Sequence, residues 1–141
     1  MCLRTMQKEP NIAENDITCY KVLTKDLVSP CYNQQYVLGE KIQSVLDYSQ
    51  GVVNKGLHTF ACLEHACNEA KYTIWYNKRT PKLSDKAPIV VKCIIPQGSL
   101  YYSGSPYYSN PYYSDSSVLE FASEQLMPLE IVYDATEYIC N

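Results

Sequence analysis

The fold prediction starts from residues 55–71, which read KGLHTFACLEHACNEAK. Leu57–Phe60 is short, is flanked by Gly56, and has the composition of a strand. In the residues that follow, Leu63, Ala66, Cys67 and Ala70 are spaced at i, i+3, i+4 and i+7, which places them on one face of a helix. The stretch therefore predicts a strand that runs directly into a helix packed through small side chains.

Strand patterns surround this unit on both sides. Ile17–Leu23 is rich in β-branched and aromatic residues, and Ile89–Ile95 is nearly continuously apolar, as in a central strand covered on both faces. Residues 118–126 return to an apolar pattern, and residues 129–133 predict a closing strand. A further short helix is expected over residues 40–48. Together these elements predict an α+β fold, a twisted and mainly antiparallel sheet with one or two packed helices.

The length of 141 residues predicts one domain. Residues 1–15 are polar and mixed in charge, so we expect a flexible N-terminal arm before a single α+β domain over residues 16–141. Within that domain, residues 100–117 are rich in Tyr, Ser and Pro, and the sequence Pro-Tyr-Tyr-Ser occurs twice. Because proline removes a backbone donor, this segment is predicted to be a surface loop.

Charge and cysteine content limit the kinds of partner and the cellular compartment that we expect for the protein. Fifteen acidic against twelve basic residues give a net charge of −3, and the chain has only two arginines, so nucleic acid is not expected as a partner. No apolar stretch is long enough for a membrane span. The first residues lack the apolar core of a signal peptide, and the seven cysteines are irregularly spaced. These features predict a reduced, cytoplasmic protein without a membrane anchor.

Four potential metal ligands, His58, Cys62, His65 and Cys67, lie within ten residues. On a helix that turns about 100° per residue, Cys67 is rotated about 200° from His65, so the four side chains cannot converge on one ion. No metal site is therefore predicted. Cys62, near the start of the helix, would be a nucleophile if His58 served as its base. No third residue in the sequence orients this pair, so the simpler interpretation is that the Cys62 thiol has a packing role.

Two segments are candidates for a binding role. The basic segment with Lys78, Arg79, Lys82 and Lys86 would hold a phosphate or simply be solvated. The tyrosines from Tyr101 to Tyr113 would contact a protein partner, because tyrosine combines a large apolar area with a polar tip, or they are a repeat tolerated in a loop. Both alternatives stay open for each segment.

Residues 55–61, KGLHTFA, with the small-residue helix after them, resemble the Lys-Gly-Ile-Tyr-Phe-Ala segment of the poly-ADP-ribosyltransferase branch of the ADP-ribosyltransferase superfamily. Residues 130–134, EIVYD, are similar to Glu-Tyr-Ile-Val-Tyr-Asp near the end of that branch. The resemblance implies NAD as cofactor and a glutamate that polarises the ribose as nicotinamide leaves. It places His58 in catalysis together with the glutamate, which is either Glu124 or Glu130. It places Tyr20, Lys21, Gly56, His58 and Phe60 at the cofactor. The family has a His-Gly or Arg motif where this chain has Tyr20 and Lys21.

The chain also resembles small proteins of phages and gut bacteria. That resemblance rests on Tyr20-Lys21, Gly56-Leu57-His58 and the segment Ile95-Pro96-Gln97-Gly98, and it implies no particular activity. Two hypotheses follow. The first is an accessory or binding protein of phage or mobile-element type, with a ligand groove near His58 and a tyrosine-rich recognition loop. The alternative is an ADP-ribosyltransferase-like domain, active or degenerate, that binds NAD or ADP-ribose.

Overall fold

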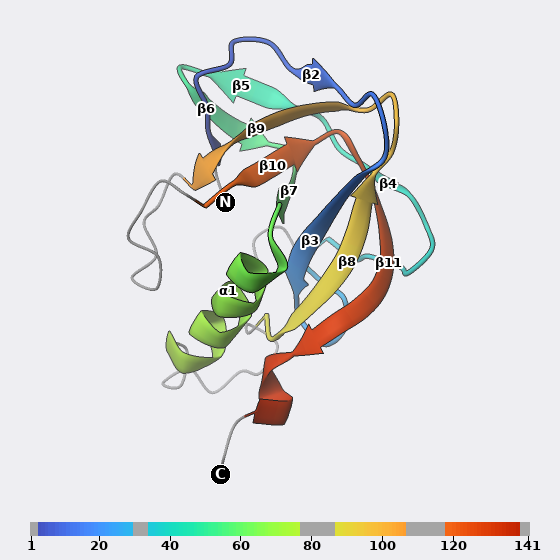
Figure 1. Ribbon diagram of the computed structural model, residues 1–141, viewed down its shortest axis with the longest axis vertical. Coiled ribbons are helices and arrows are strands. Elements are labelled where there is room, and N and C mark those ends of the chain that lie inside the picture. Colours follow the sequence, from blue (N-terminus) through green and yellow to red (C-terminus); the bar gives the residue numbers. More distant parts are fainter. Residues whose placement is uncertain (1–2, 30–33, 77–86, 107–117, 139–141) are drawn as a thin grey trace.

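Figure 1 shows a computed structural model of the protein, which describes residues 3–29, 34–76, 87–106 and 118–138. Antiparallel strands form a curled sheet, and the α-helix α1 (Leu63–Tyr76) packs against it. A short 3-10 helix, η3 (Ala135–Tyr138), follows the last strand. The prediction of a single α+β domain with an antiparallel sheet and a packed helix is therefore confirmed.

The described residues form eleven strands. They are β1 (Leu3–Arg4), β2 (Asn11–Ile12), β3 (Ile17–Leu23), β4 (Ile42–Gln43), β5 (Asp47–Ser49), β6 (Val52–Lys55), β7 (Leu57–Phe60), β8 (Ile89–Ile95), β9 (Leu100–Pro106), β10 (Glu120–Ser123) and β11 (Gln125–Asp134). Their order across the sheet is β4-β11-β8-β3-β7-β10-β9-β1-β6-β5, with β2 paired to β9. The central position predicted for β8 is confirmed, because β8 pairs with β3 on one side and with β11 on the other.

The sheet consists of two halves that meet between β3 and β7. Only one pair of residues, Tyr20 and Phe60, joins these two strands in register. Beside it, Lys21 Nζ donates a hydrogen bond to the backbone oxygen of His58 at 2.7 Å. One of the places where the chain passes from one half to the other is Glu124, between β10 and β11 (Figure 1). The region around β7 is thus the junction of the two halves.

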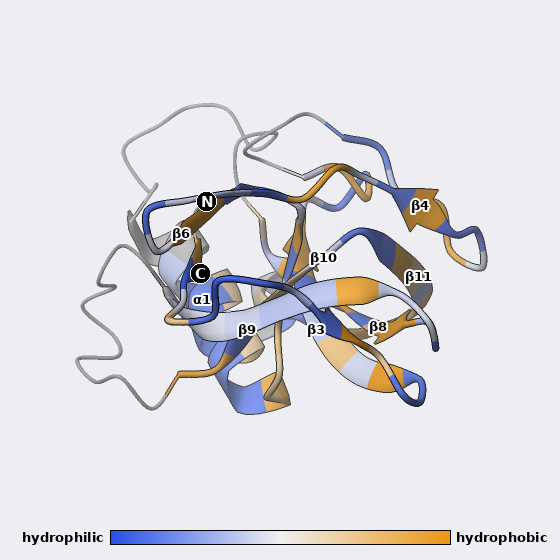
Figure 2. Ribbon diagram, turned by 90° about the horizontal axis from the view of Figure 1, so that it is seen from above, coloured by the Kyte–Doolittle hydropathy of each residue, from blue (hydrophilic) through white to orange (hydrophobic). Residues whose placement is uncertain are grey.

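Three clusters of apolar side chains hold the structure together. The inner core lies on one face of the sheet and is formed by Ala13, Cys19, Leu23, Tyr36, Leu57, Ile89, Val91, Cys93, Ile95, Phe121 and Leu126. The helix-side cluster contains Phe60, Ala66, Ala70, Val90, Val118 and Ala135. The N-terminal cluster contains Leu3, Val53, Tyr102 and Ala122. In Figure 2, β8 is largely hydrophobic, whereas much of α1 is hydrophilic.

The helix lies close to the sheet because its contact face is made of small residues. Ala66 and Ala70 are fully buried and Cys67 is half-buried against the same cluster, as their spacing predicts. Leu63, the first residue of the predicted face, is instead 39% exposed, because it lies in the first turn, at the rim of the contact. A short side chain at each contact position allows a close approach between helix and strand backbones.

Residues 3–13 differ from the expected loose arm. Leu3 is fully buried, β1 pairs with both β6 and β9, and β2 pairs with β9. Gly104 makes this possible, because a Cβ atom at that position would clash with the backbone carbonyl of Arg4. The arm therefore completes the sheet, which its polar composition did not indicate.

The helix predicted over residues 40–48 is wrong, because β4 and β5 occupy this region. Ile42 pairs with Leu126 in the sheet, and Leu46 packs against the N-terminal cluster, but Val45 is 73% exposed. Three apolar residues at helical spacing did not define a buried face here. The competing pairing with β11 and β6 decided the local structure.

The tyrosine-rich segment is a loop only in part of its predicted range. Its first residues form β9, where Tyr102 is 4% exposed and stacks on Tyr48 with ring centroids 5.5 Å apart. Tyr101 meets Phe121 edge-to-face at 5.8 Å. These two tyrosines therefore belong to the packed sheet. Residues 107–117, with the other four tyrosines of the segment, lie outside the described residues.

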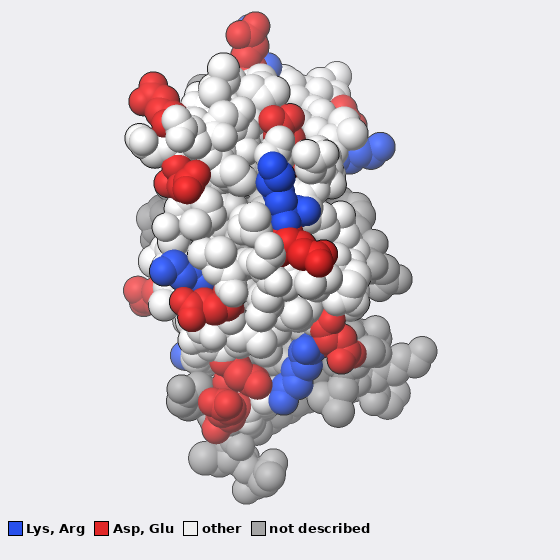
Figure 3. Space-filling view, turned by 90° about the vertical axis from the view of Figure 1, so that its right-hand side faces the viewer, with Lys and Arg blue, Asp and Glu red and all other residues white. Residues whose placement is uncertain are grey.

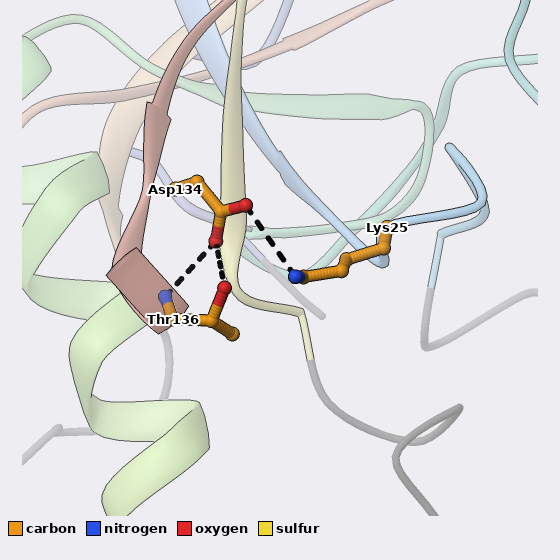
Figure 4. A network of polar contacts seen from close by, with 3 residues as sticks. All are labelled: Lys25, Asp134 and Thr136. Carbon is orange, nitrogen blue, oxygen red and sulfur yellow. Dashed lines mark hydrogen bonds and ion pairs between the residues drawn. The ribbon is translucent and has the colours of Figure 1, made fainter. Parts of the chain in front are cut away.

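A polar network closes the C-terminal end of β11 (Figure 4). Asp134 Oδ1 accepts hydrogen bonds from the backbone nitrogen of Thr136 at 2.9 Å and from its hydroxyl at 2.6 Å. Lys25 Nζ lies 3.6 Å from Asp134 Oδ2. These contacts cap η3 and hold Ala135 against the helix-side cluster.

Candidate functional site

Of the residues predicted to lie at a site, Tyr20, His58 and Phe60 share the face of the sheet that α1 covers. Tyr20 is half-buried and lies directly opposite Phe60, which is 4% exposed. His58 is two residues from Phe60 on the same strand, and alternate residues of a strand project from the same face. The structure therefore brings these three residues together beside the helix.

His58 is a buried polar residue. It is 5% exposed, and its Nε2 atom has no hydrogen-bond partner among the described residues. Burial lowers the pKa of His58 to about 3, and the positive charge of Lys21 acts in the same direction. The imidazole is therefore uncharged at neutral pH, and one of its two nitrogen atoms is available inside the protein.

Lys21 supports His58 from the opposite face of the sheet. Its ammonium group donates to the backbone oxygen of His58 and lies 5.8 Å from the centre of the Tyr36 ring. Tyr36 belongs to the inner core, together with Cys19 and Cys93, which are opposite one another on β3 and β8. Lys21 thus fixes the backbone of β7 at the junction of the two half-sheets.

Gly56 gives β7 room to approach its neighbours. Its φ angle is +149°, and a Cβ atom there would lie 2.8 Å from Leu46 Cδ2 and 3.4 Å from Ala122 Cβ. A side chain at this position would push these neighbours away. The close contact of Gly56 is therefore with the protein's own side chains.

The two glutamates predicted for catalysis lie apart from His58. Glu124 Oε1 accepts a hydrogen bond from the backbone nitrogen of Leu100 at 2.9 Å, and its backbone bonds to Leu100 and Ser44. This carboxylate anchors the bend between β10 and β11. Glu130 is exposed on β11 opposite Lys92, and β8 and β3 separate it from β7. At about 4.8 Å per strand, that separation is roughly 14 Å.

The glutamate that does lie beside His58 is Glu120, which sequence reasoning missed. It is the first residue of β10, stands opposite Phe60 on β7 and Gly104 on β9, and is 2% exposed. Its Oε2 atom has no hydrogen-bond partner among the described residues. The only signal in the sequence is a single acidic residue within the apolar run Val118-Leu119-Glu120-Phe121-Ala122.

Burial raises the pKa of Glu120 to about 8. The negative charge of Glu69 on α1 acts in the same direction, and the positive charge of Lys21 opposes it. Glu120 is therefore mostly protonated at neutral pH. A carboxyl group with such a pKa is suited to proton transfer or to hydrogen bonding as a neutral acid.

Glu120 and His58, the polar pair, occupy one place in the sheet. His58 is opposite Ala122, two residues along β10 from Glu120, so the pair are diagonal neighbours on one face, with Cα atoms roughly 7 Å apart. Val118 and Phe60 of the helix-side cluster lie on one side and Ala122 of the N-terminal cluster lies on the other. The polar pair therefore interrupts what would otherwise be a continuous apolar layer.

Among the described residues, the cysteines and potential metal ligands are not gathered into a metal-binding cluster. No group of three or more histidine, cysteine, aspartate or glutamate side chains within the described residues is arranged to hold a metal ion. Cys62 is exposed and Cys67 is half-buried, with its pKa raised by burial. The basic segment with Lys78, Arg79, Lys82 and Lys86 lies outside the described residues.

The charged side chains on the side shown in Figure 3 do not gather into a binding face. On the side shown in Figure 3, basic and acidic side chains are interspersed, without a large area of one sign. Within the described part of the chain, no helix is long and apolar enough to cross a membrane. The polar pair is therefore the feature of the described structure that most needs a functional explanation.

Comparison of the chain with protein-family models, with curated proteins and with solved structures gave no match.

Proposed function

We propose that the protein is a small binding module of accessory type and that the polar pair, Glu120 and His58, contacts its ligand. The observation that carries this proposal is the burial of two polar side chains, each leaving an atom without a hydrogen-bond partner among the described residues. A buried polar group without a partner costs about 1–3 kcal/mol. Two such groups side by side lower the stability of the folded state, and a purely structural core does not need them. A ligand that forms hydrogen bonds with both groups would offset this loss of stability.

The surroundings of the polar pair favour a binding role over a packing role. The opposite face holds the large inner core, which already stabilises the sheet without these residues. Lys21 on that face holds the β7 backbone at His58. The helix-covered layer beside the pair contains the apolar side chains of two clusters, and Lys92 lies further along the same row of the sheet, opposite Tyr20. Two polar side chains between apolar clusters are the mixture of groups that is typical of small-molecule sites.

Replacement of the polar pair by apolar side chains tests this proposal even while the ligand is unidentified. Glu120→Met and His58→Leu keep approximate size but remove the buried polar atoms. If the pair serves a ligand, the free energy of unfolding at pH 7, measured by urea denaturation, should be unchanged or rise by about 1–3 kcal/mol. Glu130→Met is the matched control, because Glu130 is exposed.

A loss of more than about 2 kcal/mol in both polar-pair variants would contradict the proposal. In that case the two residues would hold the fold together rather than serve a ligand.

The alternative is an ADP-ribosyltransferase-like domain that binds NAD or ADP-ribose. Three features support it: β7 runs directly into α1 in the segment that resembles this family, the sheet has two halves that meet there, and a glutamate on a late strand lies beside His58. In this alternative Glu120, rather than Glu124 or Glu130, is the carboxyl group that would face the ribose.

Titration of the protein with NAD and with ADP-ribose, each at millimolar concentration, distinguishes the two proposed functions. Binding to the folded state raises the melting temperature by linkage. The alternative requires such a shift in the wild type, its loss in Glu120→Met, and release of nicotinamide for an active enzyme. An unchanged melting temperature with both compounds would exclude the alternative. A shift that is lost in Glu130→Met but kept in Glu120→Met would return the site to the glutamate that the family resemblance indicates.

A further inference from the structure

Cys19 and Cys93 are two thiols that face one another in the middle of the sheet. They lie directly opposite one another on β3 and β8, and the register between these strands runs without a break from Ile17 to Leu23. Both side chains are fully buried in the inner core, so they project from the same face of the sheet. Both are free thiols. The polar pair projects from the other face, so the proposed function does not involve these cysteines.

The positions of the two cysteines fit a disulfide bond. Residues directly opposite one another in an antiparallel pair have Cα atoms about 4.5–5.5 Å apart. Disulfide bonds usually join cysteines whose Cα atoms are about 4.4–6.8 Å apart. Burial raises the pKa of Cys93, and the charge of Cys19 acts in the same direction, as expected for two thiols that lie close together. The strand pairing therefore permits a bond between the two sulfur atoms.

The other described cysteines are not placed in this way. Cys62 is exposed and precedes α1, and Cys67 lies on α1 against the helix-side cluster. The sheet separates that cluster from the inner core, which contains Cys19 and Cys93. Among the described cysteines, Cys19 and Cys93 are thus the two that strand register holds together.

We infer that Cys19 and Cys93 are a redox-sensitive pair, a dithiol under reducing conditions that closes to a cross-strand disulfide by exchange with a small-molecule disulfide such as oxidised glutathione. One cysteine thiolate attacks oxidised glutathione, which forms a mixed disulfide and releases one glutathione thiolate. The second cysteine thiolate attacks the protein sulfur atom of this mixed disulfide and releases the second. The two cysteines lose two electrons, which oxidised glutathione gains, and their two protons pass to the released glutathione thiolates.

Burial determines when this exchange takes place. It raises the pKa of Cys19 to about 12 and also raises the pKa of Cys93, so both side chains are thiols rather than thiolates at neutral pH. Their full burial also keeps glutathione away from the sulfur atoms. The exchange therefore requires that β3 separates from β8 or that the chain has not yet folded. The redox state of the pair is set at that moment, and the closed sheet preserves it.

The disulfide would stabilise the fold at a defined place. A bond between two positions far apart in the chain lowers the entropy of the unfolded state. Tyr20 and Lys21 follow Cys19 on β3, and Lys21 donates its hydrogen bond to the backbone of His58 on β7. The bond therefore holds β3 on β8 next to the junction of the two half-sheets.

A variant with only these two cysteines tests the inference, with alanine in place of the other five of the seven. The equilibrium between its dithiol and disulfide forms is measured in glutathione buffers, in native conditions and in concentrated urea, starting from the reduced and from the oxidised protein. Alkylation and mass spectrometry quantify the two forms. The equilibrium constant for closing the disulfide should be at least about tenfold larger in the folded protein, a difference of about 1.4 kcal/mol. By linkage, the oxidised form should be more stable to urea than the reduced form by the same amount.

The wild type tests the pairing with all seven cysteines present. After refolding from urea in oxidised glutathione, peptide mapping should find Cys19 linked to Cys93 in the wild type and in the matched control Cys62→Ala. Cys19→Ala and Cys93→Ala should lack this link and the gain in stability on oxidation. In the already folded wild type, the rate of closing should rise with added urea, because the exchange requires opening of the sheet.

An equilibrium constant that is equal or smaller in the folded protein would overturn the inference, and the two thiols would then serve packing alone. Refolded wild type in which Cys19 and Cys93 stay unlinked, or are linked to other cysteines, would do the same. If the two-cysteine variant does not fold, the peptide mapping of the wild type decides. None of these results depends on the polar pair, so the proposed function stands or falls separately.

Discussion

Two acidic residues in this protein, Asp134 and Glu120, show opposite ways of placing a carboxyl group. Asp134 at the end of β11 accepts two hydrogen bonds from Thr136 and pairs with Lys25, and its pKa is lowered despite partial burial. Glu120 is almost fully buried, has an oxygen atom without a partner among the described residues, and has a raised pKa. The first arrangement stabilises the fold, whereas the second is a cost to the fold. In the proposed function, a ligand that bonds to Glu120 offsets this cost.

The largest expected effect concerns Glu120 and pH. Because the folded state holds a proton that the unfolded state releases above pH 4.5, the free energy of unfolding of the wild type falls as pH rises toward 8. Glu120→Gln lacks this dependence, so its stability relative to the wild type should grow by about 1.4 kcal/mol per pH unit between pH 4.5 and 8. Urea denaturation across this range, with Glu130→Gln as control, measures the difference.

The expected difference would be absent if the free energies of unfolding of wild type and Glu120→Gln changed in parallel over this pH range. Glu120 and Asp134 would then not differ in the way that their surroundings indicate. Glu120 would then ionise in the folded state as easily as in the unfolded chain.

A smaller effect of opposite sign is expected for His58. Its pKa is lower in the folded state, so the unfolded chain takes up a proton that the folded state excludes, and wild-type stability falls as pH decreases below 6.5. Between about pH 6.5 and 4.5, His58→Gln should gain about 3 kcal/mol relative to the wild type, at about 1.4 kcal/mol per pH unit. Direct titration of the His58 ring by NMR provides the second measurement. A ring that titrates near pH 6.5 would contradict the burial argument.

The smallest effect is expected at Asp134. Because its pKa is lowered in the folded state, it contributes stability above the ordinary pKa of an aspartate, and this contribution is lost as pH falls through the folded-state value. Asp134→Asn should cost about 1 kcal/mol or less at pH 7, since the ion pair with Lys25 is exposed to solvent. The loss should shrink in about 1 M salt and vanish once the pH falls below the lowered folded-state pKa of Asp134. Thermal unfolding of Lys25→Ala separates the contribution of the ion pair from that of the hydrogen bonds to Thr136. Lys25→Ala should lose less stability than Asp134→Asn, because it removes only the ion pair.

Elements with strong local patterns were predictable. The strand Leu57–Phe60, the helix face with Ala66 and Ala70, and the apolar strand Ile89–Ile95 are present as expected. In each case side-chain type and spacing decide the local structure. His58 was also singled out from the sequence, but its burial was not foreseen.

The failures involve residues whose place depends on distant pairing. The segment over residues 40–48 became two short strands because β11 and β6 lie next to it. Leu3 entered the core because β9 has a glycine at position 104. Glu120 was overlooked because nothing in its local sequence shows that it lies opposite Phe60, 60 positions earlier in the chain.

The sequence by itself thus determined an α+β domain, a strand that leads into a small-residue helix, and the presence of a histidine on that strand, because these depend on periodicity and composition. The tertiary structure alone decided which carboxyl group meets that histidine. Glu120, Glu124 and Glu130 are all acidic residues on the last two strands or the bend between them. Strand register decides that Glu120 is buried and neutral, that Glu124 bonds to the backbone and that Glu130 is exposed and charged. Register is a long-range property, because each antiparallel pair joins segments that are far apart in the chain.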